Sequence, residues 1–137
     1  MQLSDWALGG AAVSLGAAAG TPMRFFISGA VARRFGETIP WGTLVVNASG
    51  CLIMGAAAAF ARAYGLSADS ELWLLVATGF LGSYTTVSSF ALQTRALLRE
   101  GERVDAVRYV LLSLVLCLAA AAGGFALLSA VLAAVQR

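Results

Sequence analysis

The chain has 137 residues, of which 60% are hydrophobic and only 12% are charged, with a formal net charge of +2. This composition lies outside the range of soluble domains and predicts an all-α membrane protein in which residues 1–137 form a single transmembrane domain, with no nucleic-acid partner. The chain contains no His and no Lys, which excludes a histidine general base, a Schiff-base lysine and a P-loop lysine.

Charged residues divide the chain into four apolar segments. The segments without Asp, Glu, Lys or Arg lie between Asp5 and Arg24, Glu37 and Arg62, Glu71 and Arg95, and Arg108 and Arg137. Each approaches or exceeds the roughly 20 residues that cross a bilayer as a helix. We therefore expect four transmembrane helices, at about residues 4–32, 40–63, 70–98 and 104–135.

The first segment carries a cation, Arg24, inside the motif TPMRFF. A charge at this depth is costly unless it faces water or a partner. Arg24 either reaches an interface from near the helix end or supplies a positive potential that draws an anion into a vestibule. Four helices in one chain cover one another only partly, which favours oligomerisation. Gly16 and Gly20 form a GxxxG motif in the same segment, and such motifs support close packing between helices.

The second segment places two polar residues on one helical face. Thr43 and Asn47 are four residues apart, and side chains at that spacing lie one above the other. Thr43 could line a pore or pack, and Asn47 could either bond a neighbouring helix or offer its NH2 group to a passing anion. Cys51 and Gly55 continue a small-residue pattern along this helix.

The third segment contains the stretch TGFLGSYTTVSSF, Thr78 to Phe90, with two glycines, six Ser or Thr residues and no charge. Hydrocarbon offers no partner to free backbone groups, so irregular chain at membrane depth must lie within protein or beside a polar cavity. Glycine-interrupted apolar segments are typical of transporter binding sites. We expect this helix to break near residues 79–85, the alternative being a continuous helix with glycines for close packing.

The fourth segment carries a polar stripe formed by Tyr109, Ser113 and Cys117 at i, i+4 and i+8. No Asp or Glu lies inside any segment, whereas proton-coupled carriers need an intramembrane carboxylate. Neutral donors without carboxylates favour an anion, because N–H, O–H and aromatic ring edges can replace its lost water.

These motifs together resemble the CrcB/Fluc family of fluoride channels. The resemblance rests on GAAAGTPMRF, PWGTLVVNASG, TGFLGSYTTVSSF and the Tyr/Ser stripe, in this order. It implies a fluoride-selective channel that releases cytoplasmic fluoride passively across a bacterial inner membrane. It also implies a homodimer of two oppositely inserted copies in the lipid bilayer, with two fluoride pathways and a structural sodium ion, Na+, at the interface.

The resemblance assigns roles to individual positions. The main-chain carbonyls of Gly82 and Thr85 would hold the sodium ion, and Arg24 would lie at the vestibule. The expected fluoride pore consists of Asn47, Thr86, Val87, Ser88, Ser89, Phe90, Tyr109, Ser113 and Cys117, with Thr43 and Tyr84 as pore or packing residues. The family usually has TTFSTF where this chain has TTVSSF, so Val87 replaces an aromatic ring, and we expect a preserved fold with altered conduction.

Charge in the loops bears on orientation. All nine basic residues are Arg, and those flanking the expected first and third loops are Arg33, Arg34, Arg95, Arg99, Arg103 and Arg108. Arg62 and Arg137 lie on the opposite side, so the positive-inside rule places both termini outside. Dual insertion then requires the nearby acidic residues to weaken this bias, or else a differently oriented partner chain.

Two other functions remain open. A small drug or metabolite transporter of similar size predicts a carboxylate within the membrane. A structural membrane subunit without transport predicts that Asn47, Phe90 and Ser113 tolerate apolar replacement.

Overall fold

The computed structural model describes residues 3–36 and 39–135, and all regular structure in these two ranges is helical. Three helices are long: α1 (Leu3–Phe35), α2 (Trp41–Tyr64) and α6 (Arg103–Val135). Between α2 and α6 runs a third segment assembled from four pieces: α3 (Glu71–Trp73), η1 (Leu74–Leu81), α4 (Gly82–Tyr84) and α5 (Val87–Arg99).

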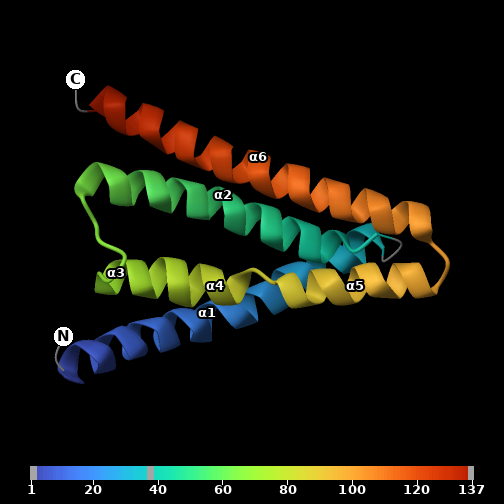
Figure 1. Ribbon diagram of the computed structural model, residues 1–137, viewed down its shortest axis with the longest axis horizontal. Helices are drawn as coiled ribbons and strands as arrows, with labels where there is room; N and C mark the ends of the chain where they lie inside the picture. The colour runs from blue at the N-terminus through green and yellow to red at the C-terminus, as the bar shows by residue number, and fades with distance from the viewer. Residues whose placement is uncertain (1–2, 37–38, 136–137) are drawn as a thin grey trace.

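The long helices pack in two layers. Helices α2 and α6 lie side by side and run in the same direction, and they form the most extensive interface in the chain (Figure 1). Helix α1 crosses the third segment at an angle and packs mainly on η1 and α4. Helix α4, which directly precedes the gap between α4 and α5, therefore lies between α1 and α2.

Three glycines end helices by adopting backbone angles that other residues disfavour. Gly36, Gly65 and Gly101 have φ of 79°, 64° and 87° and follow α1, α2 and α5. Glycine enters this left-handed region without a Cβ clash and satisfies the last carbonyls of the helix. Each glycine thereby allows a short connection to the next helix.

Three helices of the described chain are long and apolar enough to cross a membrane: α2, the third segment taken as Glu71–Arg99, and α6. Helix α1 has 33 residues but is not among them. It contains Asp5, Pro22 and Arg24 together with several glycines, which lower its hydropathy. All four helical segments are thus long enough to cross a membrane. Three of them are also apolar enough, and α1 as a fourth span stays a prediction.

The third segment breaks later and over a shorter stretch than residues 79–85. Residues Leu74–Leu81 form a π-helical stretch, and Gly82 is helical with φ −63° and ψ −33°. Only Thr85 and Thr86 are extended, with ψ of 161° and 123°. The two glycines therefore do not interrupt the helix. The interruption lies at Thr86, whose N–H bonds the Asn47 side chain of α2 in place of a carbonyl of its own helix.

The small-residue motifs serve packing within the chain. A Cβ at Gly16 or Gly20 would collide with the backbone of η1, and a Cβ at Gly79 would collide with Val13 of α1. A Cβ at Gly55 would likewise meet the Ala121 carbonyl of α6. These motifs therefore do not support oligomerisation, contrary to the expectation from sequence, because the glycines pack against other helices of the same chain.

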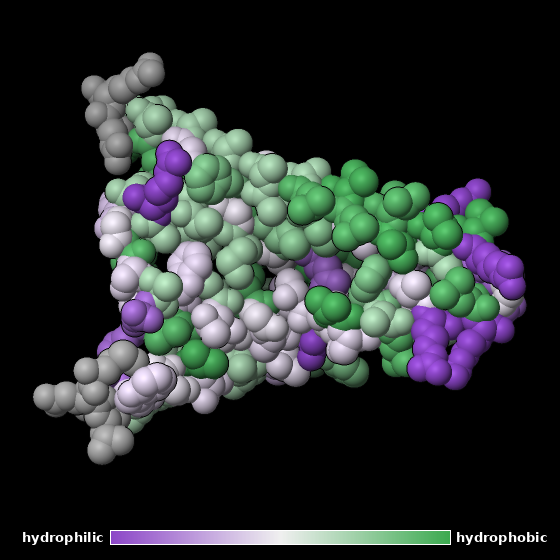
Figure 2. All heavy atoms as spheres, in the orientation of Figure 1, coloured by the Kyte–Doolittle hydropathy of each residue, from purple (hydrophilic) through white to green (hydrophobic). Residues whose placement is uncertain are grey.

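Charged residues gather at one end of the molecule. Figure 2 shows hydrophilic side chains at the end where α5 meets α6, and a band of apolar side chains along the middle of α6. The two helix ends there carry Arg95, Arg99, Arg103 and Arg108, of which Arg108 pairs with Asp105 at 3.1 Å. Glu37 and Arg137, which entered the prediction of spans and orientation, lie outside the described residues.

Candidate functional site

Asn47 of α2 holds the break in the third segment. Its Nδ2 donates to the Thr86 carbonyl at 2.9 Å, and its Oδ1 accepts from the Thr86 N–H at 2.8 Å. In a continuous helix the Thr86 N–H would bond the Gly82 carbonyl. Asn47 thus bonds a neighbouring helical segment, which is the first of the two roles expected for it. We call this pair of hydrogen bonds the clamp, and it leaves one Nδ2 hydrogen of Asn47 unused.

Tyr84 anchors the chain just before the break. Its side chain is only 3% exposed, its hydroxyl lies 2.8 Å from Ser49 Oγ of α2, and its ring stacks on Phe80 with centroids 5.9 Å apart. Of the two roles considered for Tyr84, the structure supports packing.

A cluster of hydroxyl groups opens α5. Thr86 is the N-cap, and its Oγ1 accepts from the Ser89 N–H at 3.2 Å. The same oxygen lies 3.1 Å from Ser88 Oγ and 3.2 Å from Ser89 Oγ. The first turn of this 13-residue helix carries partial positive charge and free N–H groups, so the break creates a site that favours an anion.

Arg24 reaches this region from α1. Its Nη1 donates to the Thr85 carbonyl at 3.4 Å, and the residue is half-buried. It lines a cavity of about 270 Å³ together with Thr43, Thr86 and Ser89. The guanidinium therefore faces a polar cavity near the α5 N-terminus, and its place at a vestibule stays a prediction.

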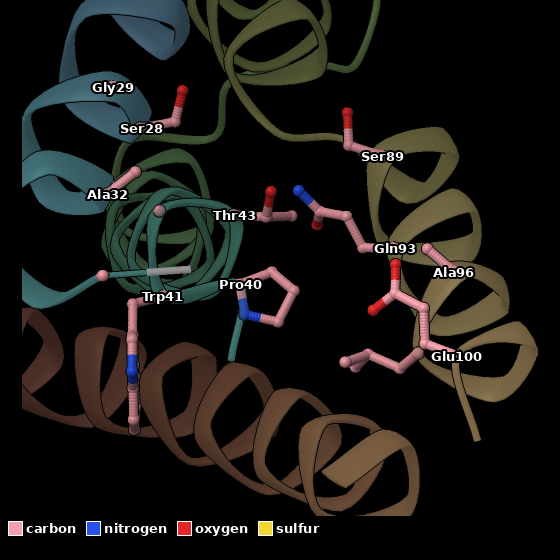
Figure 3. Close-up of a pocket in the computed structure, with 13 residues that line it drawn as sticks. Ser28, Gly29, Ala32, Pro40, Trp41, Thr43, Ser89, Gln93, Ala96 and Glu100 are labelled. Carbon is pink, nitrogen blue, oxygen red and sulfur yellow. The ribbon is translucent and has the colours of Figure 1, made fainter. Parts of the chain in front are cut away.

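A second cavity continues the first toward the charged end of the molecule. Its volume is about 430 Å³, and it shares Ser28, Thr43 and Ser89 with the smaller cavity. In Figure 3 the side chains of Thr43, Ser89 and Gln93 point into it from α2 and α5. The shared lining makes one polar route between α1, α2 and α5, which passes Gln93 and leads to Glu100 at the end of α5.

A second row of polar groups lies between α2 and α6. Thr43 lies near Tyr109, and two turns further along Cys51 faces Cys117, one turn before the contact of Gly55 with Ala121. Because the two helices run parallel with the same spacing, Asn47 and Ser113 occupy the level between these pairs. We call these three pairs the polar ladder. One turn beyond it, Gly55 packs against Ala121 and closes the row with small apolar residues.

Tyr109 joins the polar ladder to α5. It is fully buried, its hydroxyl donates to Gln93 Oε1 at 2.9 Å, and its ring lies 5.3 Å from that of Phe90. Phe90, the aromatic residue at the end of the TTVSSF motif, thus packs on the Tyr109 ring of α6. Sequence reasoning missed Gln93, although it lies four residues after Ser89 on the same face of α5.

Ser113 is the unusual member of the polar ladder. Its side chain is 7% exposed, and within residues 3–36 and 39–135 its Oγ is buried with no hydrogen-bond partner. A buried hydroxyl without a partner costs about 1–3 kcal/mol, and native proteins satisfy nearly all such groups. The geometry therefore leaves a donor available to a ligand at this level.

Other predicted pore residues do not lie at this site within one chain. Val87 is 79% exposed, and Ser88 is also exposed. Neither lines the two cavities that contain Thr43 and Ser89. The single chain therefore brings together the expected residues of α2, α5 and α6 but leaves the start of α5 facing outward.

Comparison with known proteins covers most of the chain. Residues 11–125 match the model of the family described as CrcB-like protein, Camphor Resistance (CrcB). This range includes the break, both cavities and the polar ladder.

Two similar proteins are each named fluoride-specific ion channel FluC 2. The protein from Rhodopseudomonas palustris (strain BisB18) is 55% identical over 115 residues, which cover 83% of this chain and 88% of the relative. The protein from Bradyrhizobium diazoefficiens is 50% identical over 117 residues, covering 85% of each chain. A third relative, fluoride-specific ion channel FluC of Opitutus terrae, is 48% identical over 109 residues, covering 79% and 83%.

Proposed function

The chain belongs to the CrcB family, and from this membership we propose that it works as a fluoride-specific ion channel. It is a multi-pass helical membrane protein, and it is a channel and not an enzyme. Fluoride is its transported ion, as the names of relatives at 46–55% identity indicate.

One observation in the structure carries the proposal to particular residues: the buried Ser113 hydroxyl has no partner in the described chain. It lies in a row of neutral donors, with Tyr109 on one side and Cys117 on the other. A small anion entering this row would gain hydrogen bonds in place of its water. Arg24 and the α5 N-terminus favour negative charge at the adjoining cavity.

Transport is passive in this proposal. A membrane potential of about 100 mV, negative inside, contributes roughly 2.3 kcal/mol per elementary charge. That energy favours anion exit without a coupled reaction, so fluoride that entered as neutral HF and dissociated inside would leave through the channel. We place the protein in a bacterial inner membrane, where such a potential exists.

We further propose four spans per chain, with α1 as the first, and a dimer of two oppositely inserted copies. Support comes from the outer surface at the level of the break, where Thr78, Gly82 and Ser88 are exposed. Hydroxyl groups and helix breaks are unfavourable against lipid, whereas a second chain can pack closely on them. The outward-facing Val87 would then lie near the partner chain.

A sodium ion at this surface fits the backbone of the break. The Gly82 carbonyl loses its usual helical donor because the Thr86 N–H bonds Asn47, and hard cations prefer oxygen ligands. The Thr85 carbonyl already accepts a long bond from Arg24, so it fits a cation less freely. We propose that Gly82 and Thr85 of both chains hold Na+, which would neutralise these carbonyl dipoles and tie the chains together.

The test of the function is efflux of fluoride and of chloride from proteoliposomes loaded with both. We expect a fluoride-selective leak that starts when a potassium ionophore sets a membrane potential. Liposomes carrying Ser113→Ala should release fluoride more slowly than those with the native chain. Equal and slow release of both anions by the native protein would contradict a fluoride channel and favour a structural subunit.

A further inference from the structure

Two thiols face each other inside the membrane-spanning part of the chain. Cys51 of α2 and Cys117 of α6 are both free and half-buried. They occupy facing positions, because Gly55 and Ala121, four residues after each of them, pack against each other. The two cysteines form the last level of the polar ladder. Nothing in fluoride conduction requires thiols, because a hydroxyl is the better donor at either position.

The surrounding packing holds the two helices close at this level. One turn beyond the cysteines, a Cβ at Gly55 would collide with the Ala121 carbonyl. A Cβ at Gly124, two turns beyond Cys117, would collide with the carbonyl of Leu52, which follows Cys51. The backbones of α2 and α6 therefore approach as closely as glycine allows. Disulfides need Cα atoms about 4.4–6.8 Å apart, and a close approach of the two backbones favours such a separation at facing positions.

We propose that Cys51 and Cys117 form a dithiol site that a two-electron oxidant closes to an intramolecular disulfide, and that closure removes the last donors from the polar ladder. In the reaction one sulfur adds to the oxidant and the second sulfur displaces it. The two thiols lose two protons and two electrons, which the oxidant takes up. The effect on conduction rests on the proposed function, whereas the closure itself does not.

The chemical test uses the full-length protein in detergent with diamide, an azo compound that is reduced to its hydrazine. We expect free thiols to fall from two per chain to none, the intact mass to fall by about 2 Da for the lost protons, and a reductant to reverse both changes. Cys51→Ser and Cys117→Ser should each keep one thiol and show no such loss. Unchanged thiols in the native chain, or bands of two chains that a reductant separates, would overturn the site.

The functional test compares fluoride efflux from the same proteoliposomes before diamide, after diamide and after reduction. We expect about a tenfold reversible decrease for the native chain, equivalent to about 1.4 kcal/mol in the barrier. Each serine variant, compared with its own untreated sample, should not respond. If the disulfide forms and efflux does not change, the thiols are not part of the conducting row. If the untreated native chain shows no efflux, the proposed function fails while the thiol measurement still stands.

Discussion

At the scale of single residues, polar side chains in this chain divide into those that hold the fold and those left with free hydrogen-bonding capacity. Asn47 uses both ends of its amide on Thr86, and Tyr84 bonds Ser49. Ser113 has no partner in the described chain. Polar residues of these helices therefore have different roles. Substitutions of the bonded residues should change stability, whereas substitution of Ser113 should change conduction.

Asn47→Leu should destabilise the protein, because it leaves the Thr86 N–H and carbonyl of a buried residue without their partner. Hydrogen bonds between membrane helices are worth about 0.6 kcal/mol on average and up to about 1.7, so we expect a loss of about 1–2 kcal/mol. Thermal unfolding in detergent measures it. Ser49→Ala, which removes the bonds of the Ser49 hydroxyl to Tyr84 and to the Val46 carbonyl of its own helix, serves as the control and should lose less. Equal stability of Asn47→Leu and the native chain would show that the clamp does not hold the break.

Ser113→Ala should act in the opposite way. The native hydroxyl makes no bond within the described residues, so its removal should leave the unfolding free energy unchanged or raise it by up to about 1 kcal/mol. Fluoride efflux should nevertheless fall. Ser14→Ala, on the exposed face of α1, controls for the loss of a hydroxyl and should leave efflux unchanged. A Ser113→Ala protein that is less stable and conducts normally would assign this hydroxyl to packing.

At the scale of elements, glycines decide how closely the helices approach. The seam between α2 and α6 aligns the polar ladder, and Gly55 and Gly124 bring the two backbones together just beyond it. The clamp by Asn47 then sets where the third segment opens, because it takes the N–H that would continue the helix. Helix packing and one amide thus position the cavities.

Gly124→Ala tests the seam against a neighbouring position. A Cβ at Gly124 would meet the Leu52 carbonyl and the Ala56 nitrogen, whereas a Cβ at Gly123 meets nothing within 4 Å. Overpacking costs typically about 1–3 kcal/mol, so Gly124→Ala should lower the unfolding midpoint and reduce efflux. Gly123→Ala should be neutral or slightly stabilising, since alanine is the better helix former. The same result for both variants would show that the seam does not depend on close backbone contact.

At the scale of the whole molecule, one chain lines a polar route and leaves the face at the start of α5 exposed. Arg24, Thr43 and Ser89 face the two cavities, while Val87 is 79% exposed. A partner chain could pack on this exposed face. The exposure of an apolar side chain beside the break therefore supports the proposed dimer.

Gly82→Trp should separate the chains without damaging either one. A Cβ at Gly82 meets only the Ala77 carbonyl at 3.7 Å, and the residue is exposed, so the single chain has room for a side chain. A bulky group there would block a partner, and we expect dimers to become monomers and efflux to be lost. Single-molecule photobleaching in bilayers counts the chains, with Gly123→Trp on α6 as the control. Dimers that persist in Gly82→Trp would contradict an interface at the break.

The sequence by itself determined the helical class and the family, because these follow from apolar composition and from motif order. It also singled out Asn47, Tyr109 and Ser113, since polar residues in apolar helices stand out at helical spacing. Only the tertiary structure decided that the break lies at Thr85 and Thr86, that Tyr84 packs, and that Gly16 and Gly20 face η1. The tertiary structure alone also shows that Tyr109 bonds Gln93 and that Cys51 faces Cys117. The physical reason is that each depends on how two helices distant in sequence are rotated toward each other, and helical spacing within one segment carries no information about the partner's rotation.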